Sequence, residues 1–138
     1  MMKFVHVALS CSDLEKTEKF YSKYFGFKRA RYIPLGDGNA IVFIKCGDFY
    51  LELFRAESPR PIPQADKDGQ NYPGWRHIAF KVDSLDAFIA EFDSELEISL
   101  GPLDFSSFIP NWKSVWVKDP EGNIIEISQG YQDELTGA

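Results

Sequence analysis

Two histidines and two glutamates occupy positions in this sequence that would suit a metal site. They stand in four short segments: His6 in FVHVALS (4–10), Glu52 in FYLELF (49–54), His77 in RHIAFKV (76–82) and Glu126 in NIIEI (123–127). Each segment alternates like a β-strand, so the polar residue and its aliphatic neighbours point to opposite faces. If the aliphatic faces pack on helices, the polar residues share the other face. Two imidazoles and two carboxylates that converge there suit a divalent metal ion.

A simpler interpretation of the same four residues is that they lie on a solvated sheet face. Antiparallel sheets often have one wet face, and a single histidine or glutamate in a strand is more often solvated than bound to a metal. The metal interpretation is favoured because the chain has only two histidines and both occupy equivalent positions of an internal repeat.

The internal repeat covers most of the chain. HVALSCSDLE (6–15) aligns without gaps with HIAFKVDSLD (77–86), at an offset of 71 residues. FYLELF (49–54) aligns with NIIEIS (123–128) at an offset of 74, which places Glu52 over Glu126. A repeat of this length indicates two copies of one supersecondary unit.

The order of predicted elements is strand, helix and three strands in each copy. The predicted fold is α+β, with two tandem βαβββ modules whose sheets curl around a cleft and whose helices lie outside. We expect one domain over residues 1–138: module 1 at 1–55, a proline-rich linker at 56–74, module 2 at 75–130 and an unstructured tail at 131–138. Because the linker is long for a compact domain, it is also expected to cover something.

Arg76 directly precedes His77, in a predicted strand over residues 75–82. Alternation would point its side chain away from that of His77. We therefore expect Arg76 to be a surface charge.

Composition narrows the function classes. The net charge of −6 disfavours a nucleic-acid partner, and no apolar run approaches the roughly 20 residues of a membrane span. No signal peptide is apparent, and Cys11 and Cys46 form no disulfide framework, so a cytoplasmic location is expected.

The sequence resembles the vicinal oxygen chelate superfamily, which includes glyoxalases, bleomycin-resistance proteins and dioxygenases. The resemblance is carried by HVALSCSDLEKTEKFYSKYFGFK, LELF, GWRHIAFKVDSLDAF and VKDPEGNIIEIS. The His, Glu, His, Glu order is most similar to glyoxalase I. It implies an octahedral divalent metal bound by His6, Glu52, His77 and Glu126, with nickel, zinc, cobalt, manganese and iron all compatible.

The same resemblance implies a lyase or isomerase that acts on a small α-oxo or α-hydroxy carbonyl compound through an enediolate. Glu52 and Glu126 would then be ligands and also the catalytic acid and base. A homodimer is implied, with the site formed within one chain or shared between two. Ser10 stands where glyoxalase I commonly has an arginine that contacts glutathione, so glutathione is not the expected carrier.

Other members of the superfamily suggest alternatives. An epimerase of the methylmalonyl-CoA kind would use related proton transfer, and an extradiol dioxygenase would leave Glu52 as a surplus ligand. A fosfomycin-type enzyme uses three protein ligands. A metal-free drug-binding protein of the bleomycin-resistance type is the alternative from a different class, and the four intact residues argue against it.

Overall fold

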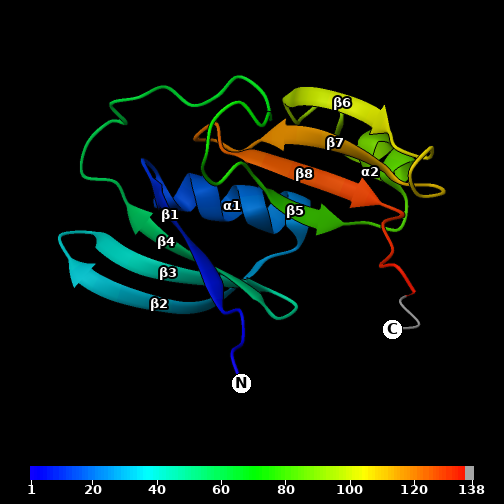
Figure 1. The fold of residues 1–138 in the computed structure, drawn as a ribbon. Helices are drawn as coiled ribbons and strands as arrows, with labels where there is room; N and C mark the ends of the chain where they lie inside the picture. The colour runs from blue at the N-terminus through cyan, green and yellow to red at the C-terminus, as the bar shows by residue number, and fades with distance from the viewer. Residues whose placement is uncertain (136–138) are drawn as a thin grey trace. The chain divides into compact units, whose positions relative to one another are not determined.

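The computed structural model describes residues 1–135 (Figure 1). Contacts within the chain divide it into two compact units, with the division between Pro63 and Gln64. The expected tail at 131–138 lies partly outside the described residues. No helix in the described part of the chain is long and apolar enough to cross a membrane.

The first unit is a four-stranded mixed sheet with one helix. Its elements are β1 (His6–Cys11), α1 (Leu14–Phe25), β2 (Lys28–Gly36), β3 (Asn39–Cys46) and β4 (Phe49–Arg55). The strand order is β1-β4-β3-β2, in which β1 and β4 are parallel and the other neighbours are antiparallel.

The second unit repeats this arrangement. Its elements are β5 (Ile78–Lys81), α2 (Leu85–Phe92), β6 (Ile98–Asp104), β7 (Lys113–Lys118) and β8 (Ile124–Gln129). The order β5-β8-β7-β6 has the same parallel and antiparallel pairs as the first sheet. The predicted α+β fold with two βαβββ modules is therefore confirmed.

Strand boundaries differ from those predicted in the second unit. The strand expected over 75–82 is β5 at Ile78–Lys81, so Arg76 and His77 precede it.

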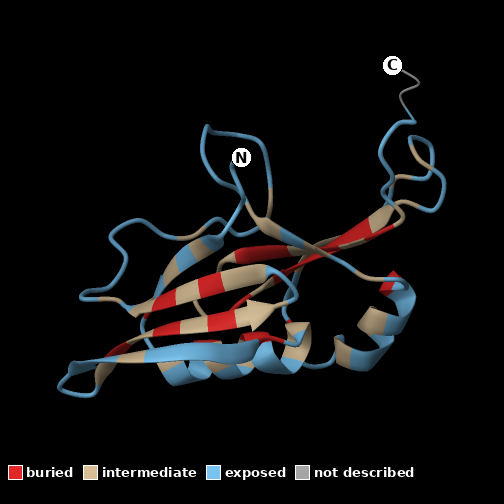
Figure 2. Ribbon diagram, turned by 90° about the horizontal axis from the view of Figure 1, so that it is seen from below, coloured by how far each residue is buried: buried red, intermediate tan, exposed pale blue. Residues whose placement is uncertain are grey.

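Each sheet buries its aliphatic face, as the alternation predicted. Leu51 and Leu53 in β4, and Ile125 and Ile127 in β8, are completely buried. Figure 2 shows the buried residues concentrated on the strands of each sheet, whereas β2 is almost wholly exposed. Because the helices contact these inner strands, the residues between the buried ones face the other way.

The helix ends are set by local hydrogen bonds. Asp13 caps α1 by accepting a hydrogen bond from the Lys16 backbone N–H at 3.0 Å, and Gly26 ends the helix in the left-handed conformation at φ 73°. Ser84 caps α2 in the same way through the Ala87 N–H at 3.1 Å.

The turn between β7 and β8 is organised by the buried Asp119. One carboxylate oxygen accepts hydrogen bonds from the Glu121 and Asn123 backbone N–H groups, both at 2.9 Å. The other oxygen accepts from the Asn123 side chain at 2.9 Å. This network sets the hairpin that carries Glu126 into β8.

The end of β8 is held against the loop before β7. Gln129 is buried, accepts a hydrogen bond from the Leu85 N–H at 2.7 Å, and donates to the Asn111 backbone and side-chain oxygens at 3.1 and 2.9 Å. Gly130 follows with a φ of 87°, and a Cβ atom there would lie 2.1 Å from the Asn111 backbone oxygen. Only glycine permits this close approach.

Gly130→Ala should therefore destabilise the protein more than another glycine substitution with the same backbone conformation. Left-handed backbone costs an L-residue about 1–2 kcal/mol, and overpacking against Asn111 should add about 1–3 kcal/mol. Gly122 has a φ of 85°, but its Cβ would meet only the Gln64 side chain at 3.3 Å. Urea unfolding should show the larger loss for Gly130→Ala than for Gly122→Ala. Equal losses would contradict the close contact.

Candidate metal and catalytic site

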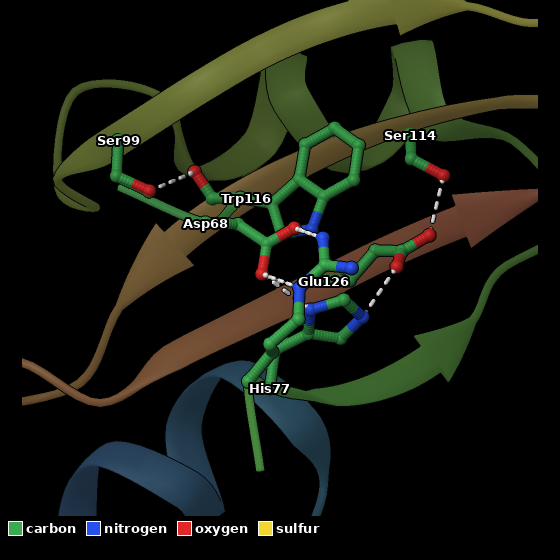
Figure 3. Close-up of polar contacts among 7 residues, drawn as sticks. Asp68, His77, Ser99, Ser114, Trp116 and Glu126 are labelled. Atoms are coloured by element: carbon green, nitrogen blue, oxygen red, sulfur yellow. Dashed lines mark hydrogen bonds and ion pairs between the residues drawn. The ribbon is translucent and has the colours of Figure 1, made fainter. Parts of the chain in front are cut away.

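In the second unit, the predicted residues His77 and Glu126 lie in contact. The Nε2 atom of His77 is 2.9 Å from the Oε1 atom of Glu126 (Figure 3). The contact follows from the strand register, because β5 and β8 are parallel and Ala79 pairs with Glu126. His77 directly precedes β5, two residues before Ala79, and its contact with Glu126 shows that its side chain reaches the same face.

In the first unit, His6 and Glu52 form the equivalent contact. Ala8 pairs with Glu52 in the parallel β1–β4 ladder, and the Nε2 atom of His6 lies 3.3 Å from the Oε1 atom of Glu52. The two registers are the same, so the internal repeat extends to the positions of the polar side chains. The first pair is more open, because the His6 side chain is 36% exposed and that of His77 is 21% exposed.

An aromatic ring accompanies each histidine at equivalent positions. Phe43 pairs with Glu52 in the β3–β4 ladder, and Trp116 pairs with Glu126 in the β7–β8 ladder. The Phe43 ring meets His6 edge to face at 6.0 Å, and the Trp116 ring meets His77 at 6.4 Å. These rings restrict the orientation of both imidazoles.

The distances within each pair suit a shared metal ion. Ligand atoms that bind one ion at about 2.1 Å and at right angles to each other lie about 3.0 Å apart. The His–Glu separations of 2.9 and 3.3 Å are close to this value, and imidazole nitrogen with carboxylate oxygen suits several divalent metals. Among residues 1–135, no three His, Cys, Asp or Glu side chains are grouped to hold a metal, so the four-residue ligand set remains a prediction.

Ser114 orients the Glu126 carboxylate in the second unit. Its hydroxyl group is completely buried, donates to the Oε2 atom of Glu126 at 2.7 Å and is hydrogen-bonded to Ser128 at 2.9 Å. Figure 3 shows Ser114 and His77 binding different oxygens of Glu126. Ser114 was not among the predicted site residues, although its alternation with Val115 and Val117 places it on the polar face.

Asp68 and Arg76 also belong to this site, although the sequence pattern predicted neither contact. The Oδ1 atom of Asp68 lies 2.8 Å from the Nδ1 atom of His77. Arg76 binds both oxygens of the same carboxylate, through Nε at 3.2 Å and through Nη2. Arg76 is exposed, as predicted, but its guanidinium binds the carboxylate that also contacts His77, a pairing that strand alternation could not predict because the strand begins only at Ile78.

Asp68 is charged despite its burial. The Asp68 side chain is only 3% exposed. Burial by itself raises the pKa of the Asp68 carboxyl group, but hydrogen bonds from Arg76 and His77 outweigh burial and hold the pKa below its ordinary value. The one sequence signal for this contact was the length of the linker, which was expected to cover something.

Removing the Ser114 hydroxyl should destabilise the protein, because Glu126 is largely buried and would lose a charge-assisted hydrogen bond. Ser114→Ala should lower the free energy of unfolding by about 1–3 kcal/mol. Ser99 is a matched control, since its hydroxyl donates only to the neutral Trp116 backbone oxygen, at 3.3 Å. Ser99→Ala should cost less than about 1 kcal/mol in urea unfolding, and an equal cost for both variants would argue against the role of Ser114.

Comparison with known families gives one match across most of the chain. The sequence model of the family described as the Glyoxalase/Bleomycin resistance protein/Dioxygenase superfamily matches residues 3–127 of this chain.

The relatives of this chain are named for different activities. The chain is 30% identical to mitochondrial methylmalonyl-CoA epimerase of Mus musculus, over 90% of this chain and 71% of the relative. It is also 30% identical to the metallothiol transferase FosB of Lysinibacillus sphaericus, over 94% and 84% of the two chains. The crystal structure of a glyoxalase family protein from Enterococcus faecalis has a TM-score of 0.64 and 28% identity, covering 91% of this chain and 96% of that one.

Proposed function

Because the chain belongs to the glyoxalase/bleomycin resistance protein/dioxygenase superfamily, we propose that it is a metal-dependent enzyme that transfers a proton at a carbon next to a carbonyl group. The observation that carries this proposal is the paired imidazole and carboxylate in each unit. Both pairs have a spacing that suits one metal ion. A solvated sheet face would not require such a contact to occur twice at equivalent positions.

The proposed ligands are the four predicted residues, His6, Glu52, His77 and Glu126. Nickel, zinc, cobalt, manganese and iron as divalent ions all accept this nitrogen and oxygen set. When bound, the metal would act as a Lewis acid for the negative charge that develops on the substrate oxygen.

The proposed acid and base are Glu52 and Glu126. Both carboxylates are largely buried, with side chains 18% and 15% exposed, and each is next to an imidazole. One carboxylate would take the proton from the substrate carbon, and one would return a proton to the same or the adjacent carbon. Return to the same carbon from the other side is epimerisation, and return to the adjacent carbon is a glyoxalase-type isomerisation.

The relatives favour epimerisation as the first activity to test. A 30% identical relative is a methylmalonyl-CoA epimerase, so the first substrate class we propose is a coenzyme A thioester with an acidic hydrogen beside its carbonyl. The glyoxalase-type reaction on a small α-oxo or α-hydroxy carbonyl compound is retained because it needs the same carboxylates.

A second candidate function is thiol transfer to a small molecule. It is favoured by the 30% identity to a metallothiol transferase over 84% of that relative. Thiol transfer would require a metal but no base that removes a proton from carbon. The two functions therefore differ in whether a second carboxylate is essential.

Loss of any proposed ligand should lower the metal affinity by at least about tenfold, because each supplies a direct bond to the ion. The variants are His6→Ala, Glu52→Gln, His77→Ala and Glu126→Gln. After loading with each divalent metal in turn and dialysis, metal per chain is measured by plasma mass spectrometry.

Glu97→Gln is the matched control for the metal measurement. The Glu97 side chain is exposed and pairs with Lys118 at 3.4 Å. The metal content of the Glu97→Gln protein should therefore equal that of the wild type. Full metal occupancy in His77→Ala and Glu126→Gln would show that the ligands are elsewhere.

Proton transfer should be visible as exchange with solvent. Incubation of a coenzyme A thioester substrate in D₂O should place deuterium at the carbon beside the carbonyl, and Glu52→Gln or Glu126→Gln should slow exchange by about 10²-fold or more. Mass spectrometry of the substrate measures the rate. A thiol adduct without deuterium exchange would favour the transferase function.

The predicted homodimer is retained as a proposal, and it bears on which chains supply the ligands. Mixing His6→Ala with His77→Ala chains tests this directly. If the ligands come from two chains, mixed dimers contain one intact set and recover metal binding. If they come from one chain, every set lacks a histidine and mixing restores nothing. Light scattering gives the oligomeric state under the same conditions.

A further inference from the structure

We propose that Asp68 is a positioning residue that holds the His77 imidazole with Nδ1 protonated and Nε2 directed at the metal. This inference rests on the proposed function, since it assigns Asp68 a role in metal binding. It goes beyond that function because Asp68 lies outside both repeats, in the segment that connects them.

The contact between Asp68 and His77 is made by a buried and fully paired carboxylate. The Asp68 Oδ1 atom lies 2.8 Å from Nδ1 of His77, and the Asp68 side chain is only 3% exposed. A carboxylate is expensive to bury unless its hydrogen bonds are satisfied. Here Arg76 binds both oxygens in the bidentate manner that is strongest for arginine and carboxylate.

The segment that carries Asp68 is anchored to the second unit at both ends. Gln64, at its start, donates to the Asn123 side-chain oxygen at 2.9 Å, in the turn between β7 and β8. At its other end, Arg76 and His77 bind Asp68 itself. The segment from Gln64 to His77 is therefore attached to the unit that contains Glu126. These attachments hold Asp68 beside His77.

This contact favours metal binding through Nε2 of His77, because the hydrogen on Nδ1 stays bound to Asp68, whereas a metal would replace any hydrogen shared between Nε2 and Glu126. A carboxylate accepts a proton, so Asp68 favours hydrogen on Nδ1. The opposite nitrogen, Nε2, is the atom that lies 2.9 Å from Glu126. A carboxylate–histidine–metal arrangement of this kind fixes the ring orientation and increases the basicity of the ligand nitrogen.

The first unit has no counterpart to this arrangement among the described residues. His6 contacts Glu52 and the edge of Phe43, and the structure gives no carboxylate against its Nδ1 atom. The position equivalent to Ser114 is Ile41, two residues before Phe43 in β3. The His77–Glu126 pair is therefore the more rigidly oriented half of the ligand set.

The experiment measures zinc affinity by competition with a chelating dye, and the His77 ring by ¹⁵N NMR. The variants are Asp68→Ala and Asp68→Asn, with Asp66→Asn as the matched control, because Asp66 is exposed two residues away. Asp68→Ala should weaken zinc binding by about 10- to 100-fold and remove the hydrogen-bonded Nδ1–H signal of His77 from the metal-free protein. Asp68→Asn should keep most of the affinity, since its amide oxygen still accepts from Nδ1–H, and Asp66→Asn should match the wild type.

The outcomes separate this inference from the function on which it rests. If the zinc affinity of Asp68→Ala is within twofold of the wild-type value, the positioning role alone is overturned. Equal weakening in Asp68→Ala and Asp68→Asn, with the Nδ1–H signal retained in both, would overturn it as well, because the effect would then be structural. Failure of the wild-type protein to bind zinc, nickel, cobalt, manganese or iron would overturn the proposed function, and this inference with it.

Discussion

The parallel pairing of the first and last strands in each unit is the constraint on which the candidate site depends. This pairing places Ala8 opposite Glu52 and Ala79 opposite Glu126, so that each histidine lies diagonally beside a glutamate on one face. A slip of one residue would move the glutamate to the helix side. The complete burial of Leu51 and Leu53 in the first unit, and of Ile125 and Ile127 in the second, opposes such a slip. The aliphatic core thereby determines where the polar groups meet.

The two units share a backbone plan but differ in how firmly they hold their polar pair. Ser114 and Asp68 contact the second pair from two sides, and the Trp116 ring lies against His77. The first pair has only the Phe43 ring beside His6 and is more exposed. This asymmetry arises from side chains, because the strand registers are the same.

Sequence patterns predicted those features that depend on local alternation and repetition. The modules, the buried aliphatic faces and the placement of the histidines and glutamates opposite those faces follow from a two-residue period and a repeated segment, which are both visible in the chain. The role of Asp68 was not predictable in this way, because a DKDG segment reads as a solvated loop until its packing is known. The exposure of Arg76 was predicted, but its pairing with Asp68 was not, because that contact depends on the packing of the connector. Ser114 could be assigned to a face, but its contact with Glu126 depends on the pairing of β7 with β8.

Asp68 lies in the connector between the two units, so substitutions can change it independently of the repeated strands and helices. The two units repeat the same strands and helix, and each has a histidine and a glutamate at equivalent positions. A connector exists once, so a substitution in residues 64–76 can alter the contacts of His77, whereas the contacts described for His6 are with Glu52 and Phe43 of its own unit. Residues 64–76 thus form a short stretch, outside every strand, at which substitutions would change the contacts of His77 without altering the strand register.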